Sequence, residues 1–502
     1  MGFGNSDFLL TALEVMSGLF IFVIGLVALA IVITFILDVS QNKQAIRHNY
    51  PVIGRFRYLF ERLGEFFRQY FFSMDREELP FNRAQRSWVY RAAKDVKNTR
   101  AFGSTRDIRI SGTVLFVNHP FPTLDKDAVE CNEITIGPYC NNPYVTDSLV
   151  NISGMSYGAI SMPAVLALSQ GAYQAGCWMN TGEGGLSACH LEGGADLVYQ
   201  IGTAKYGVRD MAGNLDLEKV KKIAAHPQIK MFELKLSQGA KPGKGGILPA
   251  EKVTEEIAQM RGIKAYEASI SPNRHPDINT IDDLLDTIDK IRRAAEKPVG
   301  FKMVLGSYGW LDTLMETINR RGDTFAPDFI TLDSSDGGTG AAPMPLMDDV
   351  GLPLRETLPV LIDKLNEYGL RDRIKVIASG KLITPTDVAW AICMGADFVV
   401  SARGFMFALG CIQALQCNKN TCPTGITTHN PRLQKGLNPE LKSVRVSNYV
   451  RNLVHDVGII AHSCGVTEPR HLGRQHARMV TENGLSIALD ELHPDVKKPL
   501  TD

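Results

Sequence analysis

The longest apolar run in the chain lies near its N-terminus. Residues 15–37 are consecutive positions without a charge. As a helix this run spans about 34 Å, which is enough for a bilayer core. A secretory signal peptide is the alternative, but residues 1–14 contain no Lys or Arg and no small-x-small cleavage site follows the run. The pattern therefore predicts a transmembrane helix, within an anchor segment of residues 1–40.

Basic residues follow the apolar run and none precedes it. They are Lys43, Arg47, Arg55, Arg57, Arg62 and Arg68. Because positive charge accumulates on the cytoplasmic side of a membrane span, we expect a single-pass protein of the inner (cytoplasmic) membrane. The rest of the chain would then face the cytoplasm.

Apolar and charged positions recur with helical spacing just after the span. The apolar ones are Phe56, Leu59, Phe60, Leu63, Phe66, Phe67, Tyr70 and Phe71. An amphipathic helix in the membrane interface explains this pattern, and so does a helix packed on the main domain. Charged segments punctuated by Pro and Gly continue over residues 75–110. We assign residues 41–110 to this juxtamembrane and linker region.

From about residue 111, short β-branched runs alternate with amphipathic helical stretches such as residues 281–296. The runs expected as core strands are 149–155, 177–182, 229–236, 266–271, 299–305, 329–335, 374–380 and 398–404. This rhythm predicts an α/β fold, a (β/α)8 TIM-type barrel over residues 111–470, with a C-terminal tail at 471–502. A doubly wound open sheet is the alternative, although no GxGxxG motif links a strand to a helix.

Composition narrows the function classes. Lys and Arg together number 54, as do Asp and Glu, so no net field recruits nucleic acid and we expect no nucleic-acid partner. The 45 glycines are spread in short motifs, which argues against collagen and low-complexity sequence.

Three of the nine cysteines are grouped in a C-x5-C-x4-C segment, as Cys411, Cys417 and Cys422. Thiolates suit iron–sulfur clusters, and three of them without a nearby His favour a three-iron cluster. Coincidental core cysteines are the alternative. The other six are scattered, and in a cytoplasmic compartment we expect them to be small buried hydrophobes.

Glycines and cations follow the later predicted strands, as Gly337, Gly338, Gly380, Lys381, Arg403 and Gly404. Glycine lets backbone N–H groups approach a phosphate, and the terminal βα loops of such barrels form the usual phosphate pocket. A phosphorylated cofactor is therefore expected. Lys302 lies in an apolar strand, where an unpaired ammonium would be costly. We expect it to point into the pocket and stabilise negative charge on a reduced flavin, with a structural salt bridge as the alternative.

Several motifs together resemble one family. The strings ISGMSYGAIS, NTGEGG, QGAKPGKGG and LDSSDGGTGAAP, followed by the three-cysteine segment, resemble in this order the FMN-binding synthase domain of glutamate synthase. The resemblance covers about residues 130–440. It implies an FMN-containing (β/α)8 barrel with a three-iron, four-sulfur (3Fe-4S) cluster on Cys411, Cys417 and Cys422.

The resemblance also implies roles for single residues. The flavin would lie against Ser153, Gly154, Met155 and Ser156, with Lys302 near its N1 and the glycine loops around its phosphate. The substrate would be 2-oxoglutarate, held by Gln238, Lys241 and Arg261, with Glu183 and Lys235 at further active-site positions. Two cationic groups suit a dicarboxylate, and Glu183 could move protons during imine formation. Without the resemblance, Arg261 and Glu183 would be interpreted as members of surface or structural ion pairs.

The chain also departs from that family. Its first cysteine is Cys131, so we expect no N-terminal glutaminase activity, and no nicotinamide-binding domain is recognisable. The nitrogen would come from ammonia, from an amine such as methylamine, or through an amidotransferase partner, and electrons from a donor protein. We predict reductive amination of 2-oxoglutarate to glutamate or an N-substituted glutamate. The alternatives are a membrane-tethered flavin and iron–sulfur electron-transfer subunit of a larger complex, and an idle scaffold.

Overall fold

The computed structural model describes residues 4–41 and 43–496. The chain divides into two compact units, residues 1–84 and residues 85–502. The first unit is helical and consists of α1 (Gly4–Ser40), α2 (Ala45–Asn49), α3 (Gly54–Phe67) and a π-helical turn, η1 (Arg68–Phe72). Within α1, Phe8–Ser40 is long and apolar enough to cross a membrane, and none of its most apolar window is buried. The predicted N-terminal apolar helix is confirmed, and it extends beyond residues 15–37 at both ends.

A buried carboxylate joins the helices of the first unit. Asp38, near the end of α1, is fully buried and pairs with Arg47 of α2 at 2.6 Å and with Arg55 of α3 at 2.9 Å. Its second oxygen accepts a hydrogen bond from the Val52 backbone N–H at 3.0 Å. One side chain therefore fixes the turn from α1 into α3.

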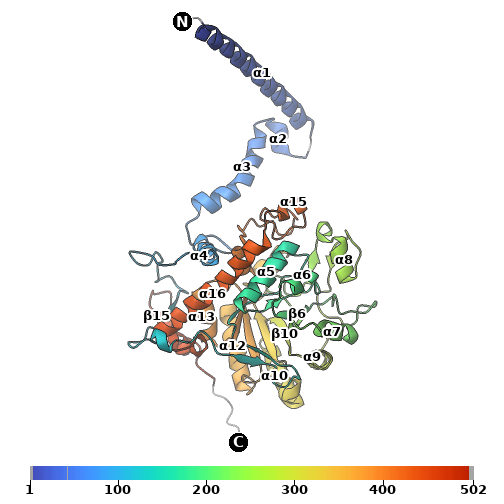
Figure 1. The fold of residues 1–502 in the computed structure, drawn as a ribbon, viewed down its shortest axis with the longest axis vertical. Coiled ribbons are helices and arrows are strands. Elements are labelled where there is room, and N and C mark those ends of the chain that lie inside the picture. Colours follow the sequence, from blue (N-terminus) through green and yellow to red (C-terminus); the bar gives the residue numbers. More distant parts are fainter. Residues whose placement is uncertain (1–3, 42, 497–502) are drawn as a thin grey trace. The chain divides into compact units, whose positions relative to one another are not determined.

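The second unit is built around a closed barrel of eight parallel strands (Figure 1). In order they are β4 (Val150–Ile152), β5 (Met179–Asn180), β6 (Leu197–Ile201), β7 (Ile229–Lys235), β10 (Val299–Val304), β11 (Phe329–Asp333), β12 (Lys375–Ser379) and β13 (Phe398–Ser401). Strand β13 pairs with β4 and closes the ring. The predicted (β/α)8 barrel is confirmed, and the doubly wound open sheet is wrong.

Seven of the eight predicted strands overlap barrel strands, and one is wrong. Residues 266–271 contain only the short β9 (Ser269–Ile270), which pairs antiparallel with β8 (Ile247–Leu248) outside the barrel. The missing barrel strand is β6, whose five residues are all buried. Tyr199 and Gln200 of this strand are both buried.

Helices follow or flank the strands. They are α4 (Arg83–Ala93), α5 (Met162–Ala175), α6 (Ala188–Glu192), α7 (Leu217–Ala224), α8 (Glu255–Arg261), α9 (Ile281–Ala295), α10 (Gly309–Arg321), α11 (Met344–Asp349), α12 (Leu354–Glu367), α13 (Pro385–Cys393), α14 (Arg403–Leu409), α15 (Pro431–Gln434), α16 (Pro439–Ser463) and α17 (Leu489–Leu492). Helix α9 starts at a capping box formed by Thr280 and Asp283, which satisfies its first backbone N–H groups. Figure 1 shows α16 running beside α5, where a Cβ at Gly171 would lie 2.5 Å from Val446.

Smaller sheets complete the second unit. A hairpin of β2 (Ile134–Ile136) and β3 (Tyr144–Thr146) packs Ile136 and Tyr144 against Trp178, Phe329 and Phe398, which lie where barrel strands begin. The hairpin therefore closes the amino-terminal end of the barrel and leaves the carboxyl end for chemistry. Strands β1 (Val114–Phe116), β14 (Ala477–Val480) and β15 (Ser486–Ala488) form a separate antiparallel sheet.

A buried ion cluster ties the outer helices to the barrel. Asp328, which is fully buried, accepts from Arg292 Nε of α9 and from Arg373 Nη2 before β12, both at 2.9 Å. It also accepts from the Val299 backbone N–H at 2.8 Å. Three successive segments of the barrel therefore depend on one carboxylate.

Asp328→Asn should destabilise the protein by about 3–5 kcal/mol, because two buried guanidinium groups lose their carboxylate. The measurement is the free energy of unfolding of the full chain in urea and mild detergent. Asp282→Asn is the matched control, since Asp282 is itself exposed and pairs with Arg320 and Arg321. The control should cost less than about 1 kcal/mol, and equal losses would contradict the assignment.

Candidate functional site

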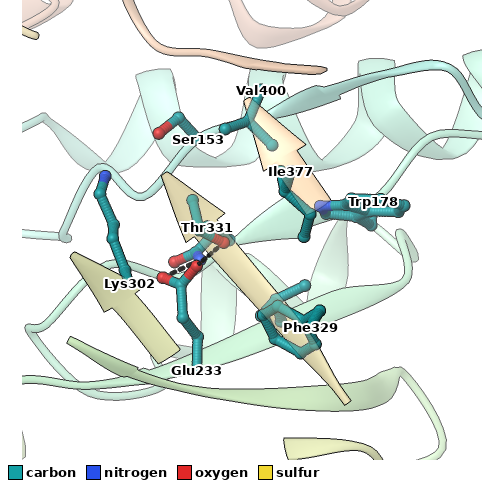
Figure 2. Close-up of a pocket in the computed structure, with 10 residues that line it drawn as sticks. Ser153, Trp178, Glu233, Lys302, Phe329, Thr331, Ile377 and Val400 are labelled. Carbon is teal, nitrogen blue, oxygen red and sulfur yellow. Dashed lines mark hydrogen bonds between the residues drawn. The ribbon is translucent and has the colours of Figure 1, made fainter. Parts of the chain in front are cut away.

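A small pocket lies inside the barrel, and all eight strands or the residues next to them contribute to it. Its lining is Ser153, Trp178, Asn180, Val198, Glu233, Lys302, Phe329, Thr331, Ile377 and Val400. Figure 2 shows Phe329 at one end and Ser153 and Lys302 at the other. The lining thus changes from apolar, near the starts of the strands, to polar and charged at their carboxyl ends.

Glu233 of β7 is the centre of a buried polar network. Its Oε2 accepts from Asn180 Nδ2 at 2.9 Å and from Gln200 Nε2 at 2.5 Å. Its Oε1 accepts from Thr331 Oγ1 at 2.7 Å (Figure 2). The network joins β5, β6, β7 and β11 across the barrel interior. A carboxylate that accepts three hydrogen bonds is well compensated for its burial.

Lys302 of β10 lines the pocket and also forms an ion pair. Its Nζ lies 3.1 Å from Asp333 Oδ2, and both side chains are buried. Burial lowers the pKa of Lys302, but the charges of Asp333 and Glu233 raise it more, so the pKa lies above its ordinary value. Lys302 is therefore a permanent cation in the pocket. Lys302 therefore points into the pocket, as expected from the sequence, and it also forms the salt bridge that was the alternative.

A second group of side chains gathers beyond the ends of β5 and β7. Lys235 Nζ lies 3.1 Å from Glu183 Oε1 and donates to Gln238 Oε1 at 2.8 Å. Gln238 in turn donates to the Gly338 carbonyl at 2.9 Å. Glu183 fits between Gly202 and Gly246. A Cβ at Gly202 would lie 2.5 Å from Glu183 Cβ, and a Cβ at Gly246 would lie 2.5 Å from Glu183 Oε1. The structure therefore brings Glu183, Lys235 and Gln238 together, as a connected chain.

The charges of this group affect one another. Burial raises the pKa of Glu183, but Lys235 and Lys241 outweigh burial and hold the pKa below its usual value. Burial, together with the charge of Lys235, lowers the pKa of Lys241 to about 8. Glu183 is therefore ionised at neutral pH, and Lys241 loses its proton more readily than an ordinary lysine.

Arg261, the last residue of α8, is buried between two loops. Its guanidinium donates to the Tyr157 carbonyl at 3.2 Å and to Ser269 Oγ at 3.3 Å, and it lies 5.1 Å from the centre of the Tyr206 ring. Its Nε has no hydrogen-bond partner among the described residues. A surface ion pair is therefore wrong for Arg261, since the side chain is buried.

The loop after β4, which carries Ser153, Gly154, Met155 and Ser156, packs closely on its neighbours. A Cβ at Gly154 would lie 2.8 Å from Asn180 Oδ1. A Cβ at Gly182, which has a positive φ of 68°, would collide with the Ser156 backbone N. Glycine at these places lets the loops after β4 and β5 meet over the pocket.

The predicted anion site lies over the ends of β11, β12 and β13. Arg403 donates to the Asp336 carbonyl, and a Cβ at Gly338 would lie 2.8 Å from Arg403 Nε. A Cβ at Gly380 would collide with Ser334 Oγ, and this hydroxyl is buried without a partner among the described residues. Burial lowers the pKa of Arg403 to about 10, which leaves it charged at neutral pH.

Two other predicted residues complete this site. Lys381 has a positive φ of 51° and its Nζ lies 3.7 Å from Asp336 Oδ1. Gly404 is packed so closely that a Cβ would collide with the Tyr449 hydroxyl. An unpartnered hydroxyl, an arginine and closely packed glycines are the donor set that suits a phosphate group.

The three grouped cysteines follow α14. Within the described part of the chain, no three His, Cys, Asp or Glu side chains are arranged to hold a single metal ion. Burial raises the pKa of the Cys411 thiol to about 12. Lys252 Nζ is buried and donates to the Cys417 carbonyl at 2.6 Å.

The conserved region in glutamate synthase matches residues 115–467 of the chain. The chain belongs to the glutamate synthase family. It is 40% identical to the glutamate synthase large subunit-like protein YerD of Bacillus subtilis, over 94% of this chain and 97% of that protein. It is 36% identical to the archaeal-type glutamate synthase [NADPH] of Thermotoga neapolitana, over 63% of this chain and 59% of that protein.

A third family member is the glutamate synthase large subunit-like protein of Rhizobium meliloti, at 28% identity over 79% of this chain and 90% of that protein. Among solved structures, the chain is similar to mandelate oxidase, at 15% identity with a TM-score of 0.46, over 78% of this chain and 98% of that one. Flavocytochrome b2 gives a TM-score of 0.45 at 14% identity, over 83% of this chain and 89% of that one.

Sequence reasoning missed the two buried carboxylates of this family member's barrel, Glu233 and Asp333. The argument that found Lys302 applies equally to Glu233, which interrupts the apolar strand β7. Asp333 ends β11 directly before the Ser-Ser-Asp-Gly-Gly segment, so that its position at a carboxyl end was available from the sequence.

Glu233→Gln should destabilise the protein by about 1–3 kcal/mol. Asn180, Gln200 and Thr331 all donate to Glu233, so the amide N–H group of the new glutamine would face another donor. The substitution also removes a charge that raises the pKa of Lys302. The free energy of unfolding in urea gives the first result, and the pH titration of the Lys302 side chain, followed by NMR of isotope-labelled lysine, gives the second. Glu192→Gln, at the end of α6, is the control and should change neither. An unchanged Lys302 profile in Glu233→Gln would contradict the electrostatic link.

Proposed function

We propose that this chain is an FMN- and iron–sulfur-dependent oxidoreductase that reductively aminates 2-oxoglutarate, giving glutamate or an N-substituted glutamate. The observation that carries the proposal is the group of Lys235, Lys241 and Glu183 beyond the ends of β5 and β7, beside the Lys302 pocket. Lys302 and the loop at Ser153, which both line that pocket, would hold a flavin there. Family membership supports the same chemistry.

FMN, when bound and reduced, supplies a hydride. Its phosphate would be held by Ser334, Arg403, Lys381 and the backbone around Gly337, Gly338, Gly380 and Gly404. Lys302 would stabilise negative charge next to the ring system. The loop of Ser153, Gly154, Met155 and Ser156 would form one wall of this site.

The residues beyond β7 would bind the substrate and handle its protons. Lys241 would attract one carboxylate of 2-oxoglutarate, Gln238 would hydrogen-bond it, and Arg261 would direct its unpartnered Nε toward the second carboxylate. Condensation of the 2-oxo group with ammonia or an amine releases water and gives an imine. The imine carbon then accepts a hydride and its nitrogen a proton, with Glu183 moving protons in both steps and Lys235 holding it in place.

We propose that Cys411, Cys417 and Cys422 would hold a 3Fe-4S cluster, which would supply one-electron transfer chemistry. Their C-x5-C-x4-C spacing and their thiolate chemistry support this proposal. The electrons would come from a separate donor protein. The match to the Thermotoga neapolitana enzyme, whose name specifies NADPH, covers 59% of that enzyme.

We further propose that α1 anchors the protein in the cytoplasmic membrane with its catalytic unit in the cytoplasm. The exposed apolar surface of α1 supports an anchor, although a signal sequence meets the same criteria of length and hydropathy. The basic residues from Lys43 to Arg68 support the orientation.

Lys241→Gln should weaken 2-oxoglutarate binding about tenfold or more, because a charged hydrogen bond is lost. In the parent protein, affinity should fall as the pH rises through about 8, since Lys241 is cationic below that pH and neutral above it. The variant should lose this pH step. The measurement is reoxidation of the anaerobically reduced protein by 2-oxoglutarate with ammonia or methylamine, followed by flavin absorbance.

Lys244→Gln, in the same loop but exposed, is the matched control and should bind like the parent. A reduced flavin that 2-oxoglutarate never reoxidises, with either amine, would instead favour the electron-transfer subunit. A purified protein without flavin would contradict both functions.

Each of Cys411→Ser, Cys417→Ser and Cys422→Ser should abolish or strongly reduce cluster assembly, because a three-iron cluster needs all three thiolates. Iron and acid-labile sulfide content, with electron paramagnetic resonance of the oxidised protein, measure the loss. Cys393→Ser, in α13, is the control and should retain iron. Iron content that is equal in all four variants would exclude the assigned ligands.

A further inference from the structure

The first unit exposes a second apolar surface in addition to α1. Along α3 and η1, Phe60 is 63% exposed and Phe71 is 74% exposed. The other exposed members of this surface are Phe56, Leu59, Leu63, Phe66, Phe67, Tyr70 and Phe72. Large apolar side chains grouped in this way on a water-facing helix would be costly, which indicates a surface that is covered by something else.

The charges around this surface are ordered. At about 100° per residue, the apolar side chains from Phe56 to Phe71 fall within an arc of about 140° around the helix. Arg57 and Arg62 border the arc on its two sides, and Glu61 and Glu65 lie opposite its centre. This order suits a bilayer surface. Arginines at the edges of the apolar arc reach phosphate oxygens, and glutamates on the opposite side face water.

The same helix is joined directly to the apolar span. Asp38 of α1 holds Arg47 and Arg55, and Arg55 belongs to the first turn of α3. The buried Asp38 cluster therefore keeps α3 next to the end of α1. In a bilayer crossed by α1, a helix held at the end of α1 would lie at the depth of the lipid headgroups.

We propose that α3 and η1 lie in the interface of the bilayer that α1 spans, with the apolar face buried and Arg57 and Arg62 bound to anionic phospholipid headgroups. This inference rests on the proposed anchoring by α1. It assigns the exposed face to lipid, not to the surface of another protein, because of the continuity with α1 and the order of the charges.

The test uses the full chain reconstituted in vesicles of phosphatidylcholine and phosphatidylglycerol with brominated acyl chains, which quench tryptophan inside the bilayer. Phe60→Trp reports on the apolar face and Glu65→Trp on the opposite face. The four native tryptophans lie outside α3 and η1, so their emission is subtracted as the parent signal. Emission from Phe60→Trp should be quenched about twofold or more relative to Glu65→Trp.

A third variant separates this inference from the anchor itself. Ile24→Trp lies in the middle of the span Phe8–Ser40. If its emission is not quenched, α1 does not cross the bilayer, and both proposals fail. If it is quenched while Phe60→Trp is not, the anchor stands and the interfacial position of α3 is overturned. Protection of Phe60→Trp from both brominated lipid and aqueous iodide would show burial against protein, which also overturns it.

The charge of the lipid supplies an independent test. In the Phe60→Trp protein, Arg57→Gln with Arg62→Gln should reduce quenching about twofold or more in vesicles that contain phosphatidylglycerol. Glu61→Gln with Glu65→Gln is the matched control and should not reduce it. In vesicles of phosphatidylcholine alone, the effect of the arginine substitutions should disappear. Quenching that does not depend on phosphatidylglycerol would overturn the assignment to anionic headgroups.

Discussion

The burial of charge inside a closed barrel is the constraint on which the rest of the catalytic unit depends. A carboxylate or ammonium loses its hydration when it enters such an interior and stays only if other groups replace the lost water. Glu233, Lys302 and Asp333 all satisfy this condition with partners on neighbouring or facing strands. Since each partner comes from a different strand, compensation of these charges also fixes how the strands are arranged.

The register of the strands follows from the same requirement. Lys302 lies beside Thr331 in the pairing of β10 with β11, and Val304 lies beside Asp333. Lys302 therefore reaches one step toward the carboxyl end of β11 to its carboxylate, while Thr331 reaches one step the other way to Glu233, which pairs with Gly300. A slip of one residue would turn these side chains out of the barrel and leave the partners uncompensated.

The sequence was most informative where one local requirement dominates. A lysine in an apolar strand predicted that Lys302 faces the pocket, and glycines after several strands predicted the closely packed loops above it. Strand β6, whose five residues are all buried, was not predicted from the sequence. Tyr199 and Gln200 of that strand are buried, and their partners, the Tyr206 carbonyl and Glu233, are known only from the structure.

The long excursion between β7 and β10 marks a second limit on sequence reasoning. Lys241 and Arg261 both belong to it, and their distance from the barrel depends on how the chain returns through β8 and α8. No periodicity predicts that path, and the same region produced the wrong strand at 266–271. Only the resemblance pointed to these two residues, whereas the partners of Arg261, the Tyr157 carbonyl and Ser269, required the structure.

The balance of charge at the mouth of the barrel constrains how an anion can bind there. Lys235, Lys241, Arg261 and Lys302 carry one positive charge more than Glu183, Glu233 and Asp333 can neutralise. Glu233 and Asp333 are tied by several hydrogen bonds, whereas Glu183 is held mainly by lysines.

An anion that entered this site would compete with Glu183 for those lysines. The competing negative charge would raise the pKa of Glu183 at the moment of binding. A carboxylate that gains a proton when its substrate arrives, and returns it later, is suited to act as an acid and a base in the same turnover. The ion pair between Lys235 and Glu183 is therefore the part of the site that is able to reorganise, while the Glu233 network beneath it stays fixed.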